Sequence, residues 1–316
     1  MAEILVSTSF ETLKPANKLH TRQCIKGKFN MHNEDFTPPR RSFIAGLAGT
    51  AAATATFGIT AGDAHAATNP YADPSKPSLP DPGMTLDLAR TALVVIDPQI
   101  DFMSPKGASW SIVGESVTEQ KTVPNLVRLF EASKRAGITV TVSPHYYYPH
   151  DHKWKFGGPL ELLQHKLGMF DRRGPLTLDG FAGSGAEFMP EFKKYIEDGK
   201  TIVCSPHKLY GPQVNDLVLQ LRKQRVDQII LAGMAANLCV ESHLRHFLEQ
   251  GFEVAVVRDA IAAAKLPEGD GYLAALVNFR FIANGLWTTE ETVRRLNRNT
   301  PITESQRDSA IRRVPA

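Results

Sequence analysis

The chain has few cysteines, little net charge and no long uninterrupted apolar run. Only three of its 316 residues are cysteine, too few for the disulfide framework of a secreted scaffold. The formal net charge is +3, which does not suggest a nucleic-acid-binding surface. Hydrophobic residues make up 42% of the chain and charged residues 22%, which is ordinary for a globular protein. Collagen-like and largely disordered classes are therefore excluded.

The first part of the chain is typical of an export signal. Arg40 and Arg41 precede a weakly apolar run of small residues over 45–61, which Gly and Thr interrupt too often for a membrane span. The run is followed by Ala64-His65-Ala66, a small-x-small pattern that a signal peptidase accepts. We therefore expect the twin-arginine export machinery to deliver the protein to the periplasm or the medium, without stable membrane insertion.

The expected organisation of the chain follows from this signal. Because such leaders are short and Met31 lies shortly before Arg40, we expect residues 1–30 to lie upstream of the true start. Removal of the signal leaves a nearly neutral chain, so neither nucleic acid nor an anionic membrane is an expected partner. The expected segments are a leader and signal over 1–66, an extended arm over 67–85, one domain over 86–298 and a tail over 299–316.

From about residue 86, short apolar runs alternate with amphipathic stretches. The runs with the length and β-branched content of buried strands are 91–96, 138–142, 201–203, 228–231 and 252–257. Apolar residues three or four positions apart, such as Val123, Leu126 and Phe130, predict helices between them. The alternation predicts an α/β fold with three layers, in which helices cover both faces of a mainly parallel, Rossmann-like sheet of about six strands. The less regular segment 145–198 is expected to cover the site as an insertion.

Three chemically active side chains stand at or just beyond predicted strand ends. Asp97 follows the first strand, Lys208 follows the third, and Cys239 begins the helix after the fourth. The carboxyl ends of parallel strands meet at one edge of a sheet, so we expect these side chains to converge there. A helix N-terminus and an ammonium group favour a thiolate, and a carboxylate can accept the thiol proton. The pattern predicts an activated cysteine nucleophile, against the alternative of a turn-capping Asp97 and an inert, buried Cys239.

Four segments resemble the isochorismatase-like cysteine hydrolases, in that family's order and spacing. They are Asp97-Pro98-Gln99-Ile100-Asp101-Phe102, Lys208-Leu209-Tyr210, Gly233-Met234-Ala235-Ala236-Asn237-Leu238-Cys239 and Arg258-Asp259-Ala260. The resemblance implies an Asp–Lys–Cys triad at Asp97, Lys208 and Cys239. It also implies a cis peptide bond between Met234 and Ala235, and an oxyanion hole formed by the backbone N–H groups of Ala235 and Cys239.

The resemblance, which includes nicotinamidases and N-carbamoylsarcosine amidohydrolases, implies hydrolysis of a C–N bond in a small amide through a cysteine thioester. One alternative is the hydrolysis of isochorismate or a related vinyl ether, which does not require a nucleophilic thiol. Another is a non-catalytic small-molecule-binding protein on the same fold. The intact Cys239 disfavours the first alternative, and Cys239 together with Asp97 and Lys208 disfavours the second. A homo-oligomer is expected from the resemblance only, and the identity of the amide stays open.

The sequence departs from the family at a metal site. Nicotinamidase-like members bind a metal through an Asp and two His residues after the second strand, and here Ser143 stands where the Asp is expected. His145, His150 and His152 follow, and imidazole groups suit Zn²⁺. We favour the interpretation that they line the substrate mouth, so that no cofactor is expected. The expected pocket residues are Gln99, Phe102, His145, Trp154 and Tyr210.

Overall fold

The computed structural model describes residues 69–299. The predicted leader and export signal, including Arg40, Arg41 and Ala66, lie outside the described residues, as does the predicted tail from residue 300 onward. The predicted segment boundaries therefore stay predictions. No helix within residues 69–299 is long and apolar enough to cross a membrane.

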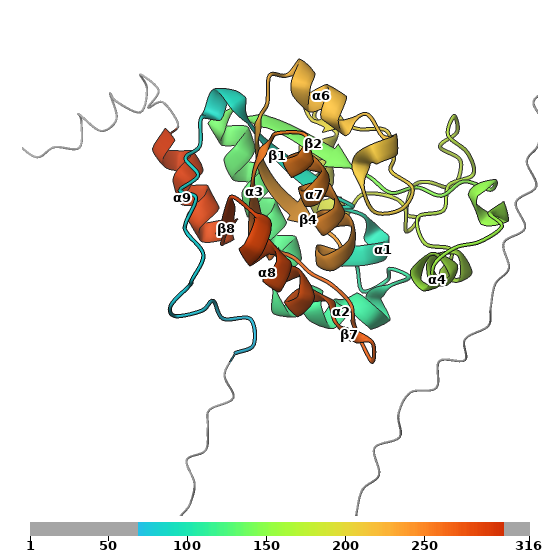
Figure 1. The fold of residues 1–316 in the computed structure, drawn as a ribbon. Helices are drawn as coiled ribbons and strands as arrows, with labels where there is room; N and C mark the ends of the chain where they lie inside the picture. Colours follow the sequence, from blue (N-terminus) through green and yellow to red (C-terminus); the bar gives the residue numbers. More distant parts are fainter. Residues whose placement is uncertain (1–68, 300–316) are drawn as a thin grey trace, which may run out of the picture. The chain divides into compact units, whose positions relative to one another are not determined.

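A parallel sheet of six strands forms the centre of the fold (Figure 1). Its order is β3-β2-β1-β4-β5-β8, and its members are β1 (Thr91–Ile96), β2 (Thr139–Ser143), β3 (Ile202–Val203), β4 (Gln228–Gly233), β5 (Glu253–Ile261) and β8 (Gly285–Trp287). Every residue of β1 and β4 is buried, as expected for strands covered on both faces. The chain runs outward from β1 to β3 on one side and from β4 to β8 on the other, so the strand order reverses between β1 and β4. Ligands of open α/β sheets bind at such a reversal, beyond the carboxyl ends of the strands.

Helices cover both faces of the sheet. One layer holds α2 (Trp110–Glu119), α3 (Thr122–Ala136), α5 (Pro190–Ile196) and α9 (Thr289–Asn299), and the other holds α6 (Leu217–Lys223), α7 (Glu241–Glu249) and α8 (Gly271–Ile282). Alternate residues of β1 face the two layers, because side chains alternate across a strand. Leu93 packs in the cluster that contains Phe130 of α3, whereas Val94 packs in the cluster that contains Phe247 of α7. The predicted three-layer α/β class with its parallel sheet is confirmed.

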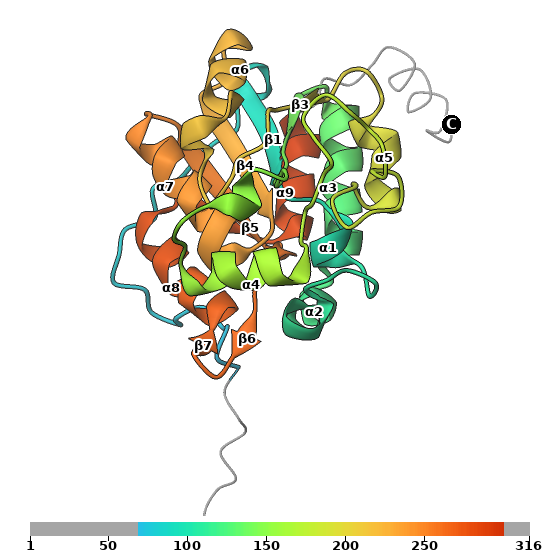
Figure 2. The ribbon, with the colours of Figure 1, turned by 90° about the vertical axis from the view of Figure 1, so that its right-hand side faces the viewer.

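The short elements lie mainly at the ends of the strands. They are η1 (Leu88–Arg90), α1 (Ile100–Met103), η2 (Asp151–Lys153), α4 (Pro159–Leu167), η3 (Pro212–Val214), η4 (Ala236–Val240), β6 (Lys265–Leu266) and β7 (Gly269–Asp270). Figure 2 shows α4 crossing in front of the sheet, beyond the carboxyl ends of the strands. The element η4 is a single turn of π-helix, which begins three residues after β4.

The structure differs from the sequence interpretation in two places. The segment 145–198, expected to be an insertion over the site, ends in α5, which packs in the helix layer with the Phe192 ring 5.6 Å from the Phe130 ring. Phe192 and Ile196 are four residues apart and so face the core together. The second difference is β8, a strand of three residues that is too short to give a periodic signal.

Gly233 ends β4 in close contact with the β1 backbone. Its φ is +116°, which L residues rarely adopt, and a Cβ placed there would lie 2.0 Å from the Ile96 carbonyl oxygen. We expect Gly233→Ala to lower the free energy of unfolding by about 3 kcal/mol or more, since the neighbouring backbone cannot move aside. Denaturation in urea, followed by circular dichroism, measures the loss.

The matched control is Gly137→Ala, at the end of α3. Gly137 also has a positive φ of +72°, but nothing lies within 4 Å of its added Cβ. Its expected loss is about 1–2 kcal/mol, from the backbone conformation alone. Equal losses of unfolding free energy in the two variants would show that the close contact between Gly233 and the Ile96 backbone does not require glycine.

Candidate active site

Asp97 and Cys239 meet at the reversal of strand order between β1 and β4. Asp97 follows β1 directly, and Cys239 lies in η4, which follows β4. One ligand-type atom from each of Asp97, His145, His207 and Cys239 lies within 4.8 Å of the corresponding atoms of the other three, and all four residues are buried. The structure thus brings together two of the three predicted catalytic residues, joined by two histidines.

The backbone at Asp97 turns sharply at the end of β1. Its φ is +49°, a left-handed conformation that Asp adopts more readily than most residues. The Asp97 N–H donates to the Ser143 carbonyl at 3.0 Å, and the Asp97 carbonyl accepts from the Gln99 N–H at 2.7 Å. One bond ties Asp97 to the end of β2 and the other closes the turn, so the backbone position from which the Asp97 side chain extends is fixed.

The π-helical turn η4 holds Cys239. The Met234–Ala235 peptide bond that leads into η4 is cis. The Ala236 N–H donates to the Ala262 carbonyl at 2.8 Å, and the Leu238 N–H donates to the Ala235 carbonyl at 3.1 Å. Cys239 itself is only 2% exposed, and its Sγ lies 3.7 Å from the Leu209 carbonyl oxygen. Such single π turns occur often at functional sites.

The surroundings of the Cys239 thiol favour its protonated form. Burial is the largest cause and raises its pKa well above the usual value, and the negative charge of Asp97 raises it further. The backbone N–H groups of Ala235 and Cys239 act in the opposite direction, because they face the sulfur and favour the thiolate. The site at rest therefore contains a neutral thiol, a carboxylate beside it and two backbone donors aimed at the same region.

His207, and not Lys208, is the basic residue beside Asp97. His207 Nε2 donates to Asp97 Oδ1 at 2.8 Å, and both side chains are fully buried. Lys208 Nζ instead donates to Asp151 Oδ2 at 2.6 Å and lies 3.7 Å from the centre of the Tyr148 ring. The prediction that Lys208 joins Asp97 and Cys239 in one cluster is corrected accordingly.

The physical reason is the backbone pairing of this segment. His207 forms a parallel bridge with His145, and its N–H donates to the Pro144 carbonyl at 3.0 Å. In such an extended segment successive side chains point to opposite sides, so His207 and Lys208 cannot both face Asp97. The sequence alone did not show which of the two adjacent basic residues faces inward. The pairing of His207 with His145 decides it, because it sets which side of the extended segment each side chain points to.

His145 closes the other side of the cluster. Its Nε2 lies 2.9 Å from the Lys208 carbonyl oxygen, which can only accept, so Nε2 carries the hydrogen. Its ring stacks on Phe170, with centroids 4.8 Å apart and an angle of 19° between the planes. Burial lowers the pKa of His145 well below its usual value, with a smaller contribution from the neighbouring His207. His145 is therefore a neutral imidazole with its Nδ1 lone pair free.

The histidines considered for a metal site do not converge. His150 is exposed, and its Nε2 lies 3.1 Å from Asp151 Oδ1, whereas His152 Nε2 lies 2.7 Å from Asp171 Oδ1. Each of these two histidines thus contacts its own carboxylate. Ser143, at the expected position of the metal-binding Asp, has its hydroxyl bonded to Asn215 and His243. The set of His145, His150 and His152, considered as the alternative to a substrate mouth, does not form a metal site in this structure.

The predicted pocket residues have different surroundings. The Gln99 amide bonds to the backbone of His145 and Ala186, so its polar atoms hold the chain and do not face a ligand. The Phe102 ring packs on Phe170 at 4.9 Å. Trp154 is 39% exposed. Tyr210 is half-buried, and burial is the main cause that raises its pKa. Cys239 is close enough to Tyr210 to raise that pKa further. Only His145 and Tyr210 of the predicted set are thus shown to lie near the thiol.

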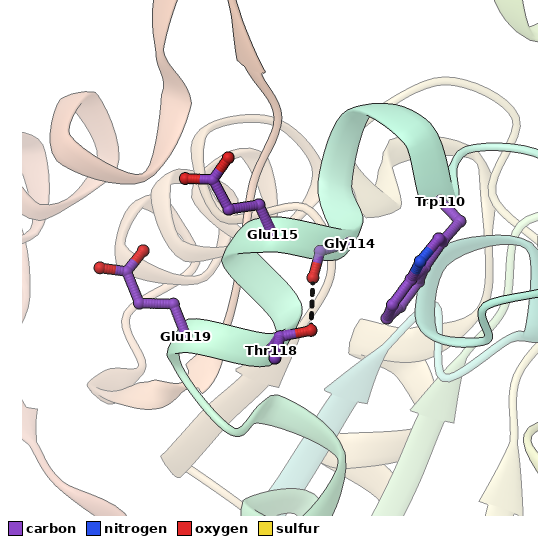
Figure 3. Close-up of a pocket in the computed structure, with 5 residues that line it drawn as sticks. All are labelled: Trp110, Gly114, Glu115, Thr118 and Glu119. Atoms are coloured by element: carbon purple, nitrogen blue, oxygen red, sulfur yellow. Dashed lines mark hydrogen bonds between the residues drawn. The ribbon is translucent and has the colours of Figure 1, made fainter.

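Two surface hollows among residues 69–299 lie away from this cluster. One of about 490 Å³ on α2 is lined by Trp110, Gly114, Glu115, Thr118 and Glu119, and Figure 3 shows both glutamates pointing away from the indole ring. A larger one, of about 710 Å³, lies between residues 73–85 and residues 279–295. Neither contains a predicted site residue.

Comparisons with known proteins agree on one family. The isochorismatase domain matches residues 91–291. The ureidoacrylate amidohydrolase RutB of Variovorax paradoxus (strain S110) is 27% identical over 190 residues, covering 58% of this chain and 73% of that protein. The isochorismatase family protein YecD of Escherichia coli O157:H7 is 45% identical over 49 residues, which are 16% of this chain and only 26% of YecD.

A solved structure shows the same fold. The cysteine hydrolase from Pseudomonas syringae pv. phaseolicola 1448A superimposes with a TM-score of 0.58 at 22% identity, covering 70% of this chain and 99% of that one. An isochorismatase family protein from Desulfovibrio vulgaris subsp. vulgaris str. Hildenborough has a TM-score of 0.51 at 19% identity, covering 66% of this chain and 98% of that one. At these identities the likeness concerns the fold.

The raised pKa of Cys239 leads to a prediction about its alkylation. At neutral pH iodoacetamide should label Cys239 more slowly than an ordinary exposed thiol, and the rate should rise as the pH increases, because the thiolate reacts. Asp97→Asn removes the negative charge that helps to raise this pKa, and labelling should quicken by about tenfold for each pKa unit relieved. Peptide mass spectrometry in a Cys204→Ser background measures the rate. Slower labelling in Asp97→Asn would show instead that Asp97 already deprotonates the resting thiol.

Proposed function

The chain belongs to the isochorismatase family of hydrolases, and from this premise we propose that it cleaves an amide-type C–N bond of a small molecule through a thioester on Cys239. Asp97 carries the protons, and His207 holds Asp97 in position. One observation carries the proposal: a buried thiol lies beside a carboxylate, with the N–H groups of Ala235 and Cys239 facing its sulfur.

In the first step, Cys239 Sγ attacks the carbonyl carbon of the amide. The S–C bond forms as the thiol proton passes to Asp97, and the π electron pair of the carbonyl moves to its oxygen. The Ala235 and Cys239 N–H groups are placed to stabilise that oxyanion, since they already face the sulfur. A contact of this class contributes about 3 kcal/mol to stabilising the transition state. A neutral resting thiol suits this step, because the proton leaves only as the new bond forms.

The remaining steps return the enzyme to its starting state. The oxyanion collapses, the C–N bond breaks, and Asp97 gives its proton to the leaving nitrogen. Water then attacks the thioester carbon while Asp97 accepts a proton from it. Expulsion of the sulfur releases the acid, and Asp97 returns the proton to Cys239. One water is consumed and each group ends in its original protonation state.

His207 takes the place that the resemblance assigned to Lys208. Its Nε2–H group occupies Asp97 Oδ1, which leaves Oδ2 without a hydrogen-bond partner as the oxygen that exchanges protons. A carboxylate held through one oxygen cannot rotate freely, so its second oxygen keeps a constant direction. Lys208 has a supporting role in this scheme, because its bond to Asp151 ties residues 207–211 to η2.

Amide cleavage is preferred over the alternatives for chemical reasons. The name of the Variovorax relative, an amidohydrolase, supports C–N hydrolysis over vinyl-ether hydrolysis. A binding protein on this fold would not require a thiol, a carboxylate and two amide donors in one buried cluster. The amide itself, and the nature of its leaving nitrogen, are for a substrate panel to identify.

Cys239→Ala tests the covalent mechanism directly. On a panel of small amides, followed by ammonia or amine release, the variant should lose activity by at least about 10⁴-fold, because the nucleophile is removed. With a slow substrate, intact-mass measurement of the wild type should show one acyl group, which peptide mapping places on Cys239. The matched control is Cys204→Ala, since burial raises the pKa of Cys204 to about 12 and keeps that thiol inert. Unchanged turnover in Cys239→Ala would rule the mechanism out.

The positioning role of His207 predicts a particular order of activities. His207→Leu removes the hydrogen bond to Asp97 and should lower kcat/KM about 100-fold, mostly in kcat. His207→Gln keeps an N–H donor and should recover most of that loss, which it would not do if His207 itself transferred a proton. Lys208→Met should cost less than about tenfold, because its ammonium contacts Asp151 and not Asp97. A larger loss in Lys208→Met than in His207→Leu would restore the Asp–Lys–Cys triad.

A further inference from the structure

Two buried polar side chains beside the active site have no part in the hydrolytic scheme. Ser143 ends β2 and His243 lies in α7, and both are fully buried. Their side chains contact each other, with Ser143 Oγ 3.1 Å from His243 Nε2. A buried polar pair of this kind contributes little more to stability than apolar side chains of the same shape. The pair therefore calls for an explanation other than stability.

His243 is a neutral imidazole with its hydrogen on Nδ1. Burial is the largest cause that lowers the pKa of His243 well below its usual value, whereas the Cys239 carbonyl acts in the opposite direction. Nδ1 lies 2.7 Å from that carbonyl oxygen, which can only accept, so Nδ1 carries the hydrogen. Nε2 is then an acceptor, and the Ser143 hydroxyl donates to it. The Ser143 oxygen accepts in turn from Asn215 Nδ2 at 3.0 Å.

This pair connects the backbone of Asp97 to the backbone of Cys239. The Ser143 carbonyl accepts from the Asp97 N–H at 3.0 Å. The Ser143 hydroxyl donates to His243, which donates to the Cys239 carbonyl. Two residues thus join the proposed base to the proposed nucleophile through consecutive hydrogen bonds. The position of each depends on the other through Ser143 and His243.

The bond from His243 also restrains the conformation of Cys239. The peptide group between Cys239 and Val240 is held at both of its polar atoms. Its C=O accepts from His243, and its N–H donates to the Ala235 carbonyl at 3.2 Å. A peptide group is planar, so bonds at both atoms fix its orientation. The Cα atom of Cys239, from which the thiol extends, is held accordingly.

The ring of His243 contacts the other half of the site as well. Its centroid lies 5.1 Å from that of His207, with an angle of 75° between the planes. His207 in turn donates to Asp97 Oδ1. One imidazole therefore contacts both the residue that holds the base and the peptide group that holds the nucleophile.

We propose that Ser143 and His243 are positioning residues for the hydrolysis, and that they set the separation of the Asp97 carboxylate from Cys239 Sγ. Neither contacts the substrate or transfers a proton. Placement matters at this scale, because a shift of about 1 Å in a reacting group can lower a rate roughly 100-fold. The proposal rests on the proposed function in that Asp97 and Cys239 are its reacting pair. It also gives a use to the serine that stands where a metal-binding Asp was expected.

The coupling between Asp97 and Cys239 tests the proposal without any substrate. In the full-length wild-type chain, Asp97→Asn should quicken the labelling of Cys239 by iodoacetamide, because it removes a negative charge beside the thiol. In a His243→Leu background this acceleration should be at least about threefold smaller, since the two groups are no longer held together. The control is His246→Leu, half-buried and nearly one turn further along α7, which should leave the acceleration unchanged. An equal acceleration in all three backgrounds would overturn the proposal.

Two amide side chains distinguish the nitrogens of His243. The amide nitrogen of Asn lies near the place of Nδ1, whereas that of Gln lies near the place of Nε2. His243→Asn can therefore still donate to the Cys239 carbonyl, and His243→Gln reaches toward Ser143 instead. We expect His243→Asn to restore most of the Asp97→Asn acceleration and His243→Gln to restore little. The opposite order would show that the contact with Cys239 is not the one that positions the thiol.

Turnover of an amide gives a second readout. His243→Leu should lower kcat about 10–100-fold with KM changed less than about threefold, because the reacting groups are displaced while the substrate contacts remain. Ser143→Ala keeps the backbone carbonyl that holds Asp97, so its loss in kcat should be smaller. It also serves as the second variant if His243→Leu does not fold. A change confined to KM would overturn the positioning role.

The two proposals fail in different ways. Unchanged turnover in Cys239→Ala, together with a reduced Asp97→Asn acceleration in His243→Leu, would remove the thioester mechanism and keep the positioning of Asp97 and Cys239. Loss of turnover in Cys239→Ala, together with an equal acceleration in all backgrounds, would keep the mechanism and remove the role of His243.

Discussion

The hydrogen bond between His207 and Asp97 is the interaction on which the site depends. Both side chains are fully buried, and a carboxylate taken out of water is costly unless a donor is paired with it. The imidazole supplies that donor and leaves one carboxylate oxygen free. Replacing it with a lysine ammonium at this depth would bury a second full charge. Lys208 lies instead where Asp151 and the Tyr148 ring surround its charge.

Hydrogen bonds at the ends of the strands keep this pair beside the Cys239 thiol. Gln99 bonds to the chain at His145, and the Ser143 hydroxyl lies between Asn215 and His243. His243 in turn contacts the Cys239 carbonyl through Nδ1 at 2.7 Å. A continuous set of hydrogen bonds therefore joins the end of β2 to the π turn that contains the thiol. A displacement of any of these strand ends would change the distance between the Asp97 carboxylate and Cys239 Sγ. The geometry of the site therefore depends directly on the packing of the sheet.

Much of this arrangement could be predicted before the structure was known. The β-branched runs at 91–96 and 228–231 predicted buried parallel strands, and the residue types at their ends predicted that Asp97 and Cys239 would meet. The partner of Asp97 could not be predicted, because His207 and Lys208 are adjacent and both are basic. The His150 and His152 spacing resembled a metal site, but the carboxylates of Asp151 and Asp171 hold them separately.

The sequence by itself determined the class of fold, the family and the presence of a cysteine after the fourth strand, because these depend on local periodicity and on motifs contiguous in the chain. The tertiary structure alone decided which basic residue faces Asp97, because the pairing of His207 with His145 sets the side to which each of the two adjacent side chains points. It also decided that His145, 94 residues before Cys239, lies beside the thiol. Distances across a sheet come from strand order and register, which no single segment encodes.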